Sequence, residues 1–275
     1  MTDVIIAVSA VAVIGIVCAV ILIIASKYMH VEVDEKEVKI REVLPGANCG
    51  ACGYTGCDGY AKALASGQTD KTNLCIPGAD KVSNDIAEIT GLEAGDVIEQ
   101  VAVVRCMGDC NKAKKKSKYE GIQSCAAAKM LYGGDGACTY GCLGLGDCQS
   151  VCNMNAICIE NGVAHVNTKL CGGCGMCAKT CPQGIISLMA DVDKVLVTCS
   201  NKDKGAVARQ QCENACIACK KCEKNCPAGA IKVENNVAVI DYSKCQKCDL
   251  CAKNCPVGCI LISDFSGVHR YNKED

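Results

Sequence analysis

The chain has 275 residues, enough for one large domain or several small ones. Its 29 Lys and Arg nearly balance 30 Asp and Glu, so no strong basic field indicates a nucleic-acid-binding protein. Nine aromatic residues cannot fill several cores, whereas 28 Cys are typical of disulfide scaffolds or metal-cluster proteins. Because the only apolar run near the start is too long for a signal-peptide core, we expect metal in a reducing compartment.

The first predicted element is one transmembrane helix. Residues Val4–Ala25 form a run of 22 positions without a charged side chain, and at ~1.5 Å per residue a helix of that length crosses the hydrocarbon layer. Asp3 precedes the run, and several basic residues follow it between positions 27 and 41. The positive-inside rule therefore predicts a single-pass protein of the cell membrane with its soluble domains on the cytoplasmic side. Such a span, without ionisable residues, offers no ion path of its own.

Farther along, one C-x2-C-x4-C group is followed by repeated C-x2-C-x2-C-x3-C-P runs, the spacing that binds iron–sulfur clusters. The rest of the chain is therefore expected to be an α+β protein with a small single-cluster iron–sulfur domain and tandem bacterial-type 2[4Fe–4S] ferredoxin-like modules. The expected division is a transmembrane anchor (1–26), a linker (27–44), a single [4Fe–4S] domain (45–92), a connecting segment (93–132), a first ferredoxin-like module (133–190), a second connecting segment (191–211), a second ferredoxin-like module (212–264) and a tail (265–275).

The first cysteine group lies in the single-cluster domain. Its members are Cys49, Cys52, Cys57 and Cys75. Helices are expected near 59–66 and 80–90, with a strand over 97–104. A four-cysteine zinc site competes with a cluster here, but the glycine-rich setting leaves backbone amides free to bond sulfides and favours a cluster.

A run of the form C-x2-C-x2-C-x3-C-P begins at Cys171 and recurs 74 residues later at Cys245, and a third copy begins at Cys216. Hairpins are expected between these runs, around Asn161-Gly162 and Asn235-Asn236. In such a run three thiolates converge on one cubane, and the cysteine before proline caps a second cluster. The C-terminal module should thus bind two [4Fe–4S] clusters, one held by Cys216, Cys219, Cys222 and Cys255, the other by Cys245, Cys248, Cys251 and Cys226.

The middle module departs from this pattern because Leu145 stands where the offset predicts a cysteine. One expected ligand set is Cys171, Cys174, Cys177 and Cys152. Cys138 is the natural substitute in the other, which is then Cys138, Cys142, Cys148 and Cys181. Zinc ribbons also contain C-x2-C pairs, but a third cysteine three residues on would be surplus and the three His lie far from these runs in sequence.

The remaining cysteines leave the number of clusters at five to six. A sixth cluster could be held by Cys106, Cys125, Cys199 and Cys212, with Cys110 as an alternative fourth ligand. Buried cysteines without a ligand role explain the spacing nearly as well. Cys158 and Cys259 are interpreted as packing residues.

Four segments carry a family resemblance over nearly the whole chain, together with the N-terminal anchor. They are residues 48–57 (NCGACGYTGC), 75–78 (CIPG), 140–148 (YGCLGLGDC) and 199–205 (CSNKDKG). They resemble the B subunits of Rnf complexes, membrane-bound ion-translocating ferredoxin:NAD oxidoreductases. The resemblance implies a subunit that exchanges electrons with soluble ferredoxin and feeds a flavin- and NAD-binding subunit, while membrane partners move Na⁺ or H⁺. It also implies that Cys199 and Cys212 are ligands.

Cubanes exchange one electron with little change in geometry, so several on one chain make an electron path. We expect entry at a C-terminal cluster and exit near the membrane through the Cys49–Cys75 cluster. No nucleotide-binding fingerprint is evident, so no flavin or NAD is expected on this chain, nor a complete active site or a catalytic residue. Alternatives are the wiring subunit of another membrane reductase and a membrane-tethered iron–sulfur sensor. The lysines between 112 and 118 could dock an acidic ferredoxin or form a solvated loop.

Overall fold

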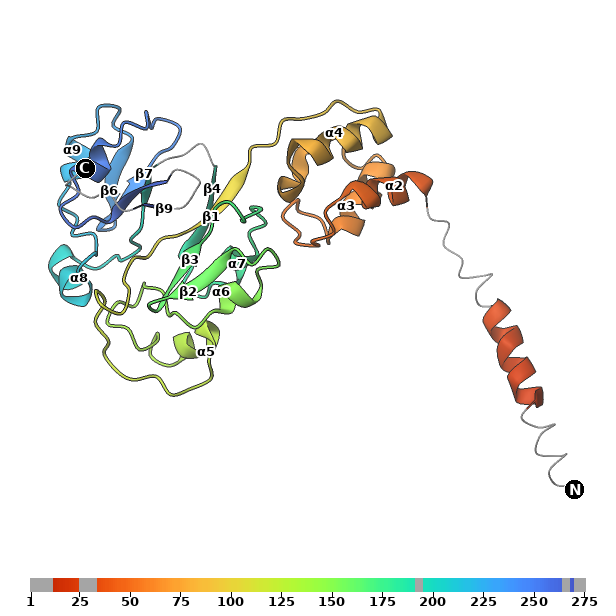
Figure 1. Ribbon diagram of the computed structural model, residues 1–275, viewed down its shortest axis with the longest axis horizontal. Coiled ribbons are helices and arrows are strands. Elements are labelled where there is room, and N and C mark those ends of the chain that lie inside the picture. The colour runs from red at the N-terminus through yellow and green to blue at the C-terminus, as the bar shows by residue number, and fades with distance from the viewer. Residues whose placement is uncertain (1–11, 25–33, 191–194, 264–267, 270–275) are drawn as a thin grey trace, which may run out of the picture.

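The computed structural model describes residues 12–24, 34–190, 195–263 and 268–269 (Figure 1). Residues 12–24 are helical and exposed. The predicted transmembrane helix, 4–25, therefore lies partly outside the described residues. Within the described part of the chain, no helix has both the length and the apolar character needed to cross a membrane.

A helical unit follows. It comprises α2 (Glu35–Val43), α3 (Cys57–Ala65) and α4 (Ala79–Thr90), with two 3-10 turns at Thr72–Leu74 and Ile76–Gly78. Helix α2 falls in the expected linker. Asp34 caps it by accepting a hydrogen bond from the Lys36 amide, and Ile40 on its inner face is fully buried with Tyr60 and Ile86. The segment before the first cysteine group is thus part of this unit's core.

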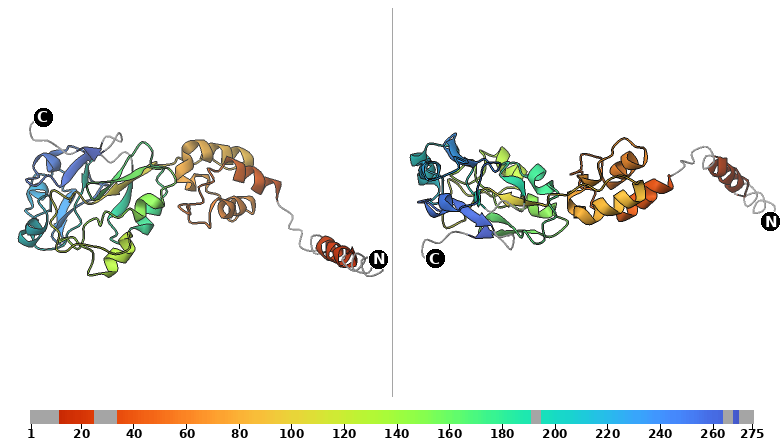
Figure 2. Two further views of the ribbon diagram at one scale, coloured as in Figure 1. Left: turned by 60° about the horizontal axis from the view of Figure 1, so that its bottom comes forward. Right: turned by 90° about the horizontal axis from the view of Figure 1, so that it is seen from above.

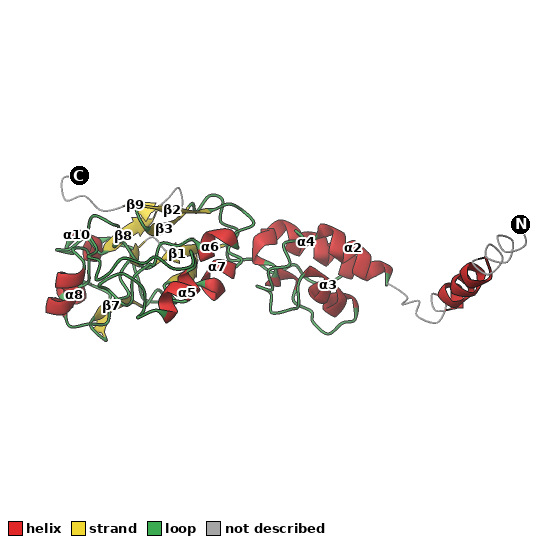
Figure 3. Ribbon diagram, turned by 90° about the horizontal axis from the view of Figure 1, so that it is seen from below, coloured by secondary structure: helices red, strands yellow, loops and turns green. Residues whose placement is uncertain are grey.

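The remainder is a mixed unit, and the strands of the described residues are confined to it (Figure 3). The three views agree that the helical unit stands beside it, joined through the chain that enters β1 (Figure 2). Its two hairpins are β2 (Ile157–Glu160) with β3 (Val163–Val166), and β6 (Ile231–Glu234) with β7 (Val237–Ile240). Both were predicted, and both turn through residues of positive φ, Asn161-Gly162 and Asn235-Asn236, as two-residue hairpins require.

Each module also receives a strand from the chain that precedes it. Strand β1 (Gln100–Val104) pairs antiparallel with β4 (Ile186–Ala190), and β5 (Val195–Val197) pairs with β8 (Ile260–Ser263). Strand β8 pairs in turn with β9 (Val268–His269). The expected connecting segments 93–132 and 191–211 therefore contribute strands to the modules.

Among the described residues, the mixed unit has six short helices, and five of them carry one cysteine each. They are α5 (Cys125–Met130), α6 (Asp147–Ser150), α7 (Met176–Thr180), α8 (Gly205–Gln211), α9 (Lys221–Lys224) and α10 (Leu250–Lys253). Buried cysteines share the cores with small aliphatic residues: Cys148 and Cys177 pack with Ile157 and Ile185 in the first module. Thiols thus occupy positions that aromatic side chains would fill in a protein of ordinary composition.

Candidate metal centres

The structure brings the first cysteine group together at the edge of the helical unit. Cys49, Cys52, Cys57 and Cys75 line one cavity of about 320 Å³, counting its opening to solvent, and Leu44 and Tyr60 also line it. The Asn48 side chain accepts a hydrogen bond from the Cys57 amide at 2.9 Å, which fixes the loop at the start of α3. Burial raises the pKa of the Cys75 thiol to about 11, and the other three thiols of the set lie close enough to add to the rise.

In the C-terminal module, Cys222 lies near Cys216, Cys219 and Cys255, the set expected from spacing. Burial, followed by the proximity of these thiols, raises the pKa of Cys222 to about 11. A fifth cysteine joins this set, since Cys259 is 2% exposed and its Sγ lies 3.6 Å from that of Cys255. A hydrogen bond from Cys259 lowers the pKa of both Cys216 and Cys255 to about 6. Spacing did not predict this contact, in which Cys259 follows Cys255 by four residues across the turn that the Gly258 amide closes on the Cys255 carbonyl.

The second expected set of this module is Cys226, Cys245, Cys248 and Cys251. Burial raises the pKa of Cys251 to about 12, and the nearby thiol of Cys245 adds to the rise. The Ala230 amide donates to the Cys226 sulfur at 3.3 Å. In the middle module the Ala156 amide donates to the Cys152 sulfur at the same distance, and these two pairs lie 74 residues apart.

Cys152 lies with its expected partners Cys171, Cys174 and Cys177. Burial raises the pKa of Cys177 to about 11, and these neighbouring thiols add to the rise. The Ala102 amide of β1 donates to the Cys171 sulfur at 3.3 Å. Strand β1 thus contributes a hydrogen-bond donor to this sulfur site in addition to its sheet pairing.

Two further cavities divide the other cysteines differently from the expected sets. One, of about 330 Å³ counting its opening to solvent, is lined by Cys125, Cys142, Cys148 and Cys181. The other, of about 500 Å³ counting its opening to solvent, is lined by Cys106, Cys138, Cys199 and Cys212 as well as Cys142. Cys125 therefore lies with the set for which spacing suggested Cys138, and Cys138 lies with the other three cysteines suggested for a sixth cluster. Cys110 lines neither cavity and is exposed, as is Cys158.

The donor chemistry of these sites fits iron–sulfur clusters. The sulfurs surround cavities rather than a point: among the described residues, no three Cys, His, Asp or Glu side chains approach closely enough to hold one metal ion. Backbone amides donate to several of the sulfurs, an arrangement that tunes the potential of a bound cluster. Because burial raises the pKa of the Cys75, Cys177, Cys222 and Cys251 thiols, ligation of iron displaces protons that these four thiols hold at neutral pH.

The lysine run between 112 and 118 is partly neutralised within the chain. Lys112 pairs with Asp109 at 2.9 Å, Lys115 with Asp135 at 2.7 Å and Lys118 with Glu120 at 2.6 Å. The backbone of this run also binds the segment around Cys212, through the Lys114 amide to the Gln211 carbonyl and the Glu213 amide to the Lys112 carbonyl. The run therefore has a structural role in holding two distant segments together.

Comparison with protein families agrees with the positions of these sites. Residues 44–77 match a model described as a putative Fe–S cluster, residues 164–187 a 4Fe–4S binding domain, and residues 215–259 a 4Fe–4S dicluster domain.

Similar proteins cover most of the chain. The B subunit of the Na⁺-translocating ferredoxin:NAD⁺ oxidoreductase complex of Acetobacterium woodii is 43% identical, over 84% of this chain and 70% of its own length. The B subunit of the proton-translocating complex of Clostridium ljungdahlii is 41% identical over 85% and 82%, and that of the ion-translocating oxidoreductase complex of Methanosarcina acetivorans is 39% identical over 84% and 88%. On these matches, the chain belongs to the family of B subunits of ion-translocating ferredoxin:NAD oxidoreductase complexes.

Proposed function

We propose that the chain is the multi-cluster iron–sulfur subunit that passes electrons between soluble ferredoxin and the flavin- and NAD-binding subunits of a membrane-bound ferredoxin:NAD oxidoreductase. The observation that carries this proposal is the succession of four-thiol sets along one chain. Clusters bound there would exchange single electrons. The cysteines of this chain would supply the ligands. The residues around them exclude water from the buried sulfurs, and backbone amides donate hydrogen bonds to several of the sulfurs.

The number of clusters in this proposal is five or six. Spacing favours one ligand set at each of four sites: the Cys49–Cys75 set, the Cys152–Cys177 set and the two sets of the C-terminal module. The thiols that lie near Cys75, Cys177, Cys222 and Cys251 support these sets. The cavities that contain Cys125 and Cys138 supply the rest.

Attachment to the membrane by one N-terminal helix is also part of the proposal. The uncharged run from Val4 to Ala25 supports it, together with the exposure of the apolar side chains within residues 12–24, where Leu22 is 69% exposed. The basic residues after the run support a cytoplasmic position for the cluster-bearing part.

Chain order suggests that electrons enter at a C-terminal cluster and leave through the Cys49–Cys75 cluster toward the membrane partners. The internal pairing of Lys112, Lys115 and Lys118 reduces the net positive field of their loop, so this run alone is a weak candidate for docking an acidic ferredoxin.

Anaerobic iron and sulfide analysis of the full chain, combined with a redox titration, tests the proposal. About 20 irons per chain support five cubanes and about 24 support six, and a reductive bleaching of the visible absorption on addition of reduced ferredoxin supports the electron-transfer role. A folded protein rich in zinc and poor in iron contradicts it.

A further inference from the structure

The two modules are equivalent over more of the chain than their C-P runs. Cys138 and Cys142 stand four residues apart, and 74 residues later Cys212 and Cys216 repeat this spacing. The same offset relates the hairpins and the strands β4 and β8. Cys138 of the first module therefore corresponds to Cys212 of the second.

A second pair of cysteines is equivalent by position in the fold. Cys106 follows β1 by two residues, and Cys199 follows β5 by two residues. The Cys142 amide donates to the Cys106 sulfur at 3.3 Å, and the Cys216 amide donates to the Cys199 sulfur at 3.3 Å. Each module thus has one cysteine at the end of its added strand and one four residues before its first cluster-loop cysteine.

These four cysteines meet in the 500 Å³ cavity at the junction of the modules. A Cβ placed on Gly108 would lie 3.3 Å from the Cys212 sulfur and 3.8 Å from the Cys106 sulfur, so that glycine lies beside both. The side chain of Asn201, 2% exposed, donates to the Cys138 sulfur at 3.4 Å. The four thiols thus line one cavity, and Gly108 and Asn201 lie beside three of them.

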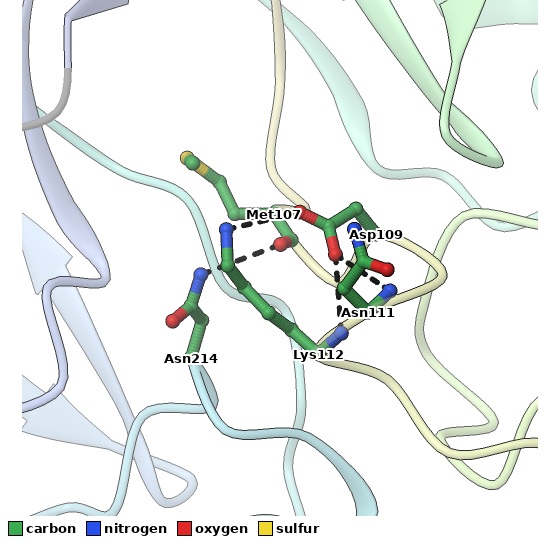
Figure 4. A network of polar contacts seen from close by, with 5 residues as sticks. All are labelled: Met107, Asp109, Asn111, Lys112 and Asn214. Carbon is green, nitrogen blue, oxygen red and sulfur yellow. Dashed lines mark hydrogen bonds and ion pairs between the residues drawn. The ribbon is translucent and has the colours of Figure 1, made fainter.

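Polar contacts fix the loops that carry two of these thiols. The Asn214 side chain donates to the Met107 carbonyl at 3.4 Å, which joins the residue after Cys106 to the segment after Cys212 (Figure 4). In the same network the Asp109 carboxylate accepts from the amides of Asn111 and Lys112 and pairs with the Lys112 ammonium. This loop is therefore built to hold one shape.

Cys125 fills the position that the repeat leaves without a cysteine. Leu145 corresponds to Cys219 by the 74-residue offset, so the loop of the first module offers only Cys142 and Cys148, with Cys181 crossing from the next run. The Asp147 carboxylate accepts hydrogen bonds from the Ser124 hydroxyl and from the amides of Cys125 and Ala126, at 2.9 to 3.0 Å, which anchors the start of α5 beside Cys148. Lys129, also on α5, donates to the Pro182 carbonyl.

We propose that Cys106, Cys138, Cys199 and Cys212 ligate a sixth [4Fe–4S] cluster at the pseudo-symmetric junction of the two modules, and that Cys125 completes the site formed by Cys142, Cys148 and Cys181. Each thiol gives up its proton as its sulfur binds one iron. This inference rests on the proposed function, since it assigns ligands to clusters of that electron path. A cluster at the junction links the clusters of the two modules, and Cys142, which lines both cavities, stands between two of them.

Pairs of alanine substitutions in the full, anaerobically purified chain test the grouping, because removal of two ligands of one cluster costs no more iron than removal of one. Cys138→Ala and Cys199→Ala should each lose about four irons, and the double variant should also lose about four rather than about eight. Cys125→Ala with Cys148→Ala should behave in the same way. Cys125→Ala combined with Cys199→Ala should lose about eight. The exposed Cys110→Ala serves as the matched control and should retain all iron.

A loss of about eight irons in the Cys138/Cys199 double variant, or of about four in the Cys125/Cys199 double variant, would overturn the grouping. So would full iron retention in Cys138→Ala. If one double variant fails to fold, the other double variant still tests the grouping. Low-temperature electron paramagnetic resonance of the reduced protein gives a second readout: both single variants of a pair should lack the same spectral component. The iron content of the unaltered chain separates a failure of the proposed function from a failure of the ligand grouping. An unaltered chain without iron contradicts the proposed function itself, whereas an iron-loaded chain whose variants lose the wrong amount contradicts only the grouping.

Discussion

Replacement of Asp147 by alanine tests how strongly one carboxylate holds a cluster site together. Its side chain accepts three hydrogen bonds at the start of α5, from the Ser124 hydroxyl at 3.0 Å, the Cys125 amide at 2.9 Å and the Ala126 amide at 3.0 Å. Burial opposes ionisation, but these amide bonds hold the pKa of Asp147 below its usual range. Loss of hydrogen bonds to a charged acceptor costs about 1.5 to 3 kcal/mol, so local opening should become easier by about this amount.

Because α5 carries Cys125, this opening exposes one proposed ligand to competing chelators. At 1.4 kcal/mol for each tenfold change, the rate at which a chelator removes about four irons from the anaerobic protein should rise by about 10- to 140-fold. Glu120→Gln is the control, because its ion pair with Lys118 is largely exposed and contributes less than about 1 kcal/mol. A rate of iron release from Asp147→Ala within about fivefold of that from Glu120→Gln would show that the Asp147 carboxylate does not hold this site together.

The remaining predictions concern three other sites. Cys259→Ala removes a thiol whose sulfur lies 3.6 Å from that of Cys255. In a redox titration, the reduction potential of the cluster held by Cys255 should fall by about 20 to 45 mV. An unchanged potential would show that Cys259 does not hydrogen-bond to the ligand sulfur. Gly173→Ala would bring a Cβ to within 2.4 Å of the Gln100 carbonyl oxygen at a φ of +64°, so the iron content should fall by about four per chain. Gly184→Ala is the control, because its φ is +63° but open space surrounds it. It should lower the free energy of unfolding by only about 1 kcal/mol and retain its iron. Tyr60→Phe removes the 2.7 Å bond to the Lys71 carbonyl and should cost about 1 kcal/mol in thermal unfolding. Because burial raises the pKa of Tyr60, the stability that the neutral phenol contributes is present below about pH 10 and is lost as the pH rises further, so the pH dependence above 10 should be weaker in Tyr60→Phe.

Local patterns in the sequence predicted the two hairpins and most of the cysteine loops. The Asn161-Gly162 and Asn235-Asn236 turns depend on backbone preferences of neighbouring residues, and C-x2-C-x2-C spacing fixes the direction of thiols on one loop. Both are properties of a few consecutive residues and can therefore be read from the chain.

The position of Cys125 could not be predicted in this way. Spacing favoured Cys138 as the substitute for the missing cysteine because it lies four residues from Cys142, whereas Cys125 reaches that site through α5 and its bonds to Asp147. Helix α2 (Glu35–Val43) was not predicted, because its charged composition indicates a linker. Only tertiary packing, of Ile40 against Tyr60 and Ile86, makes it part of a core. For Cys125, the sequence did contain one indication: Cys138 corresponds to Cys212 by the 74-residue offset, which places Cys138 outside the cluster loop and leaves that site one cysteine short.

Strand β1 determines where the mixed unit can be cut from the rest of the chain for separate study. A fragment that starts at residue 133 lacks the antiparallel partner of Ile186–Ala190 and leaves that strand as an open edge, a surface on which copies of the fragment can pair and precipitate. Expression of a self-sufficient piece must begin upstream of Gln100, so the natural boundary for crystallisation or spectroscopy lies just after helix α4.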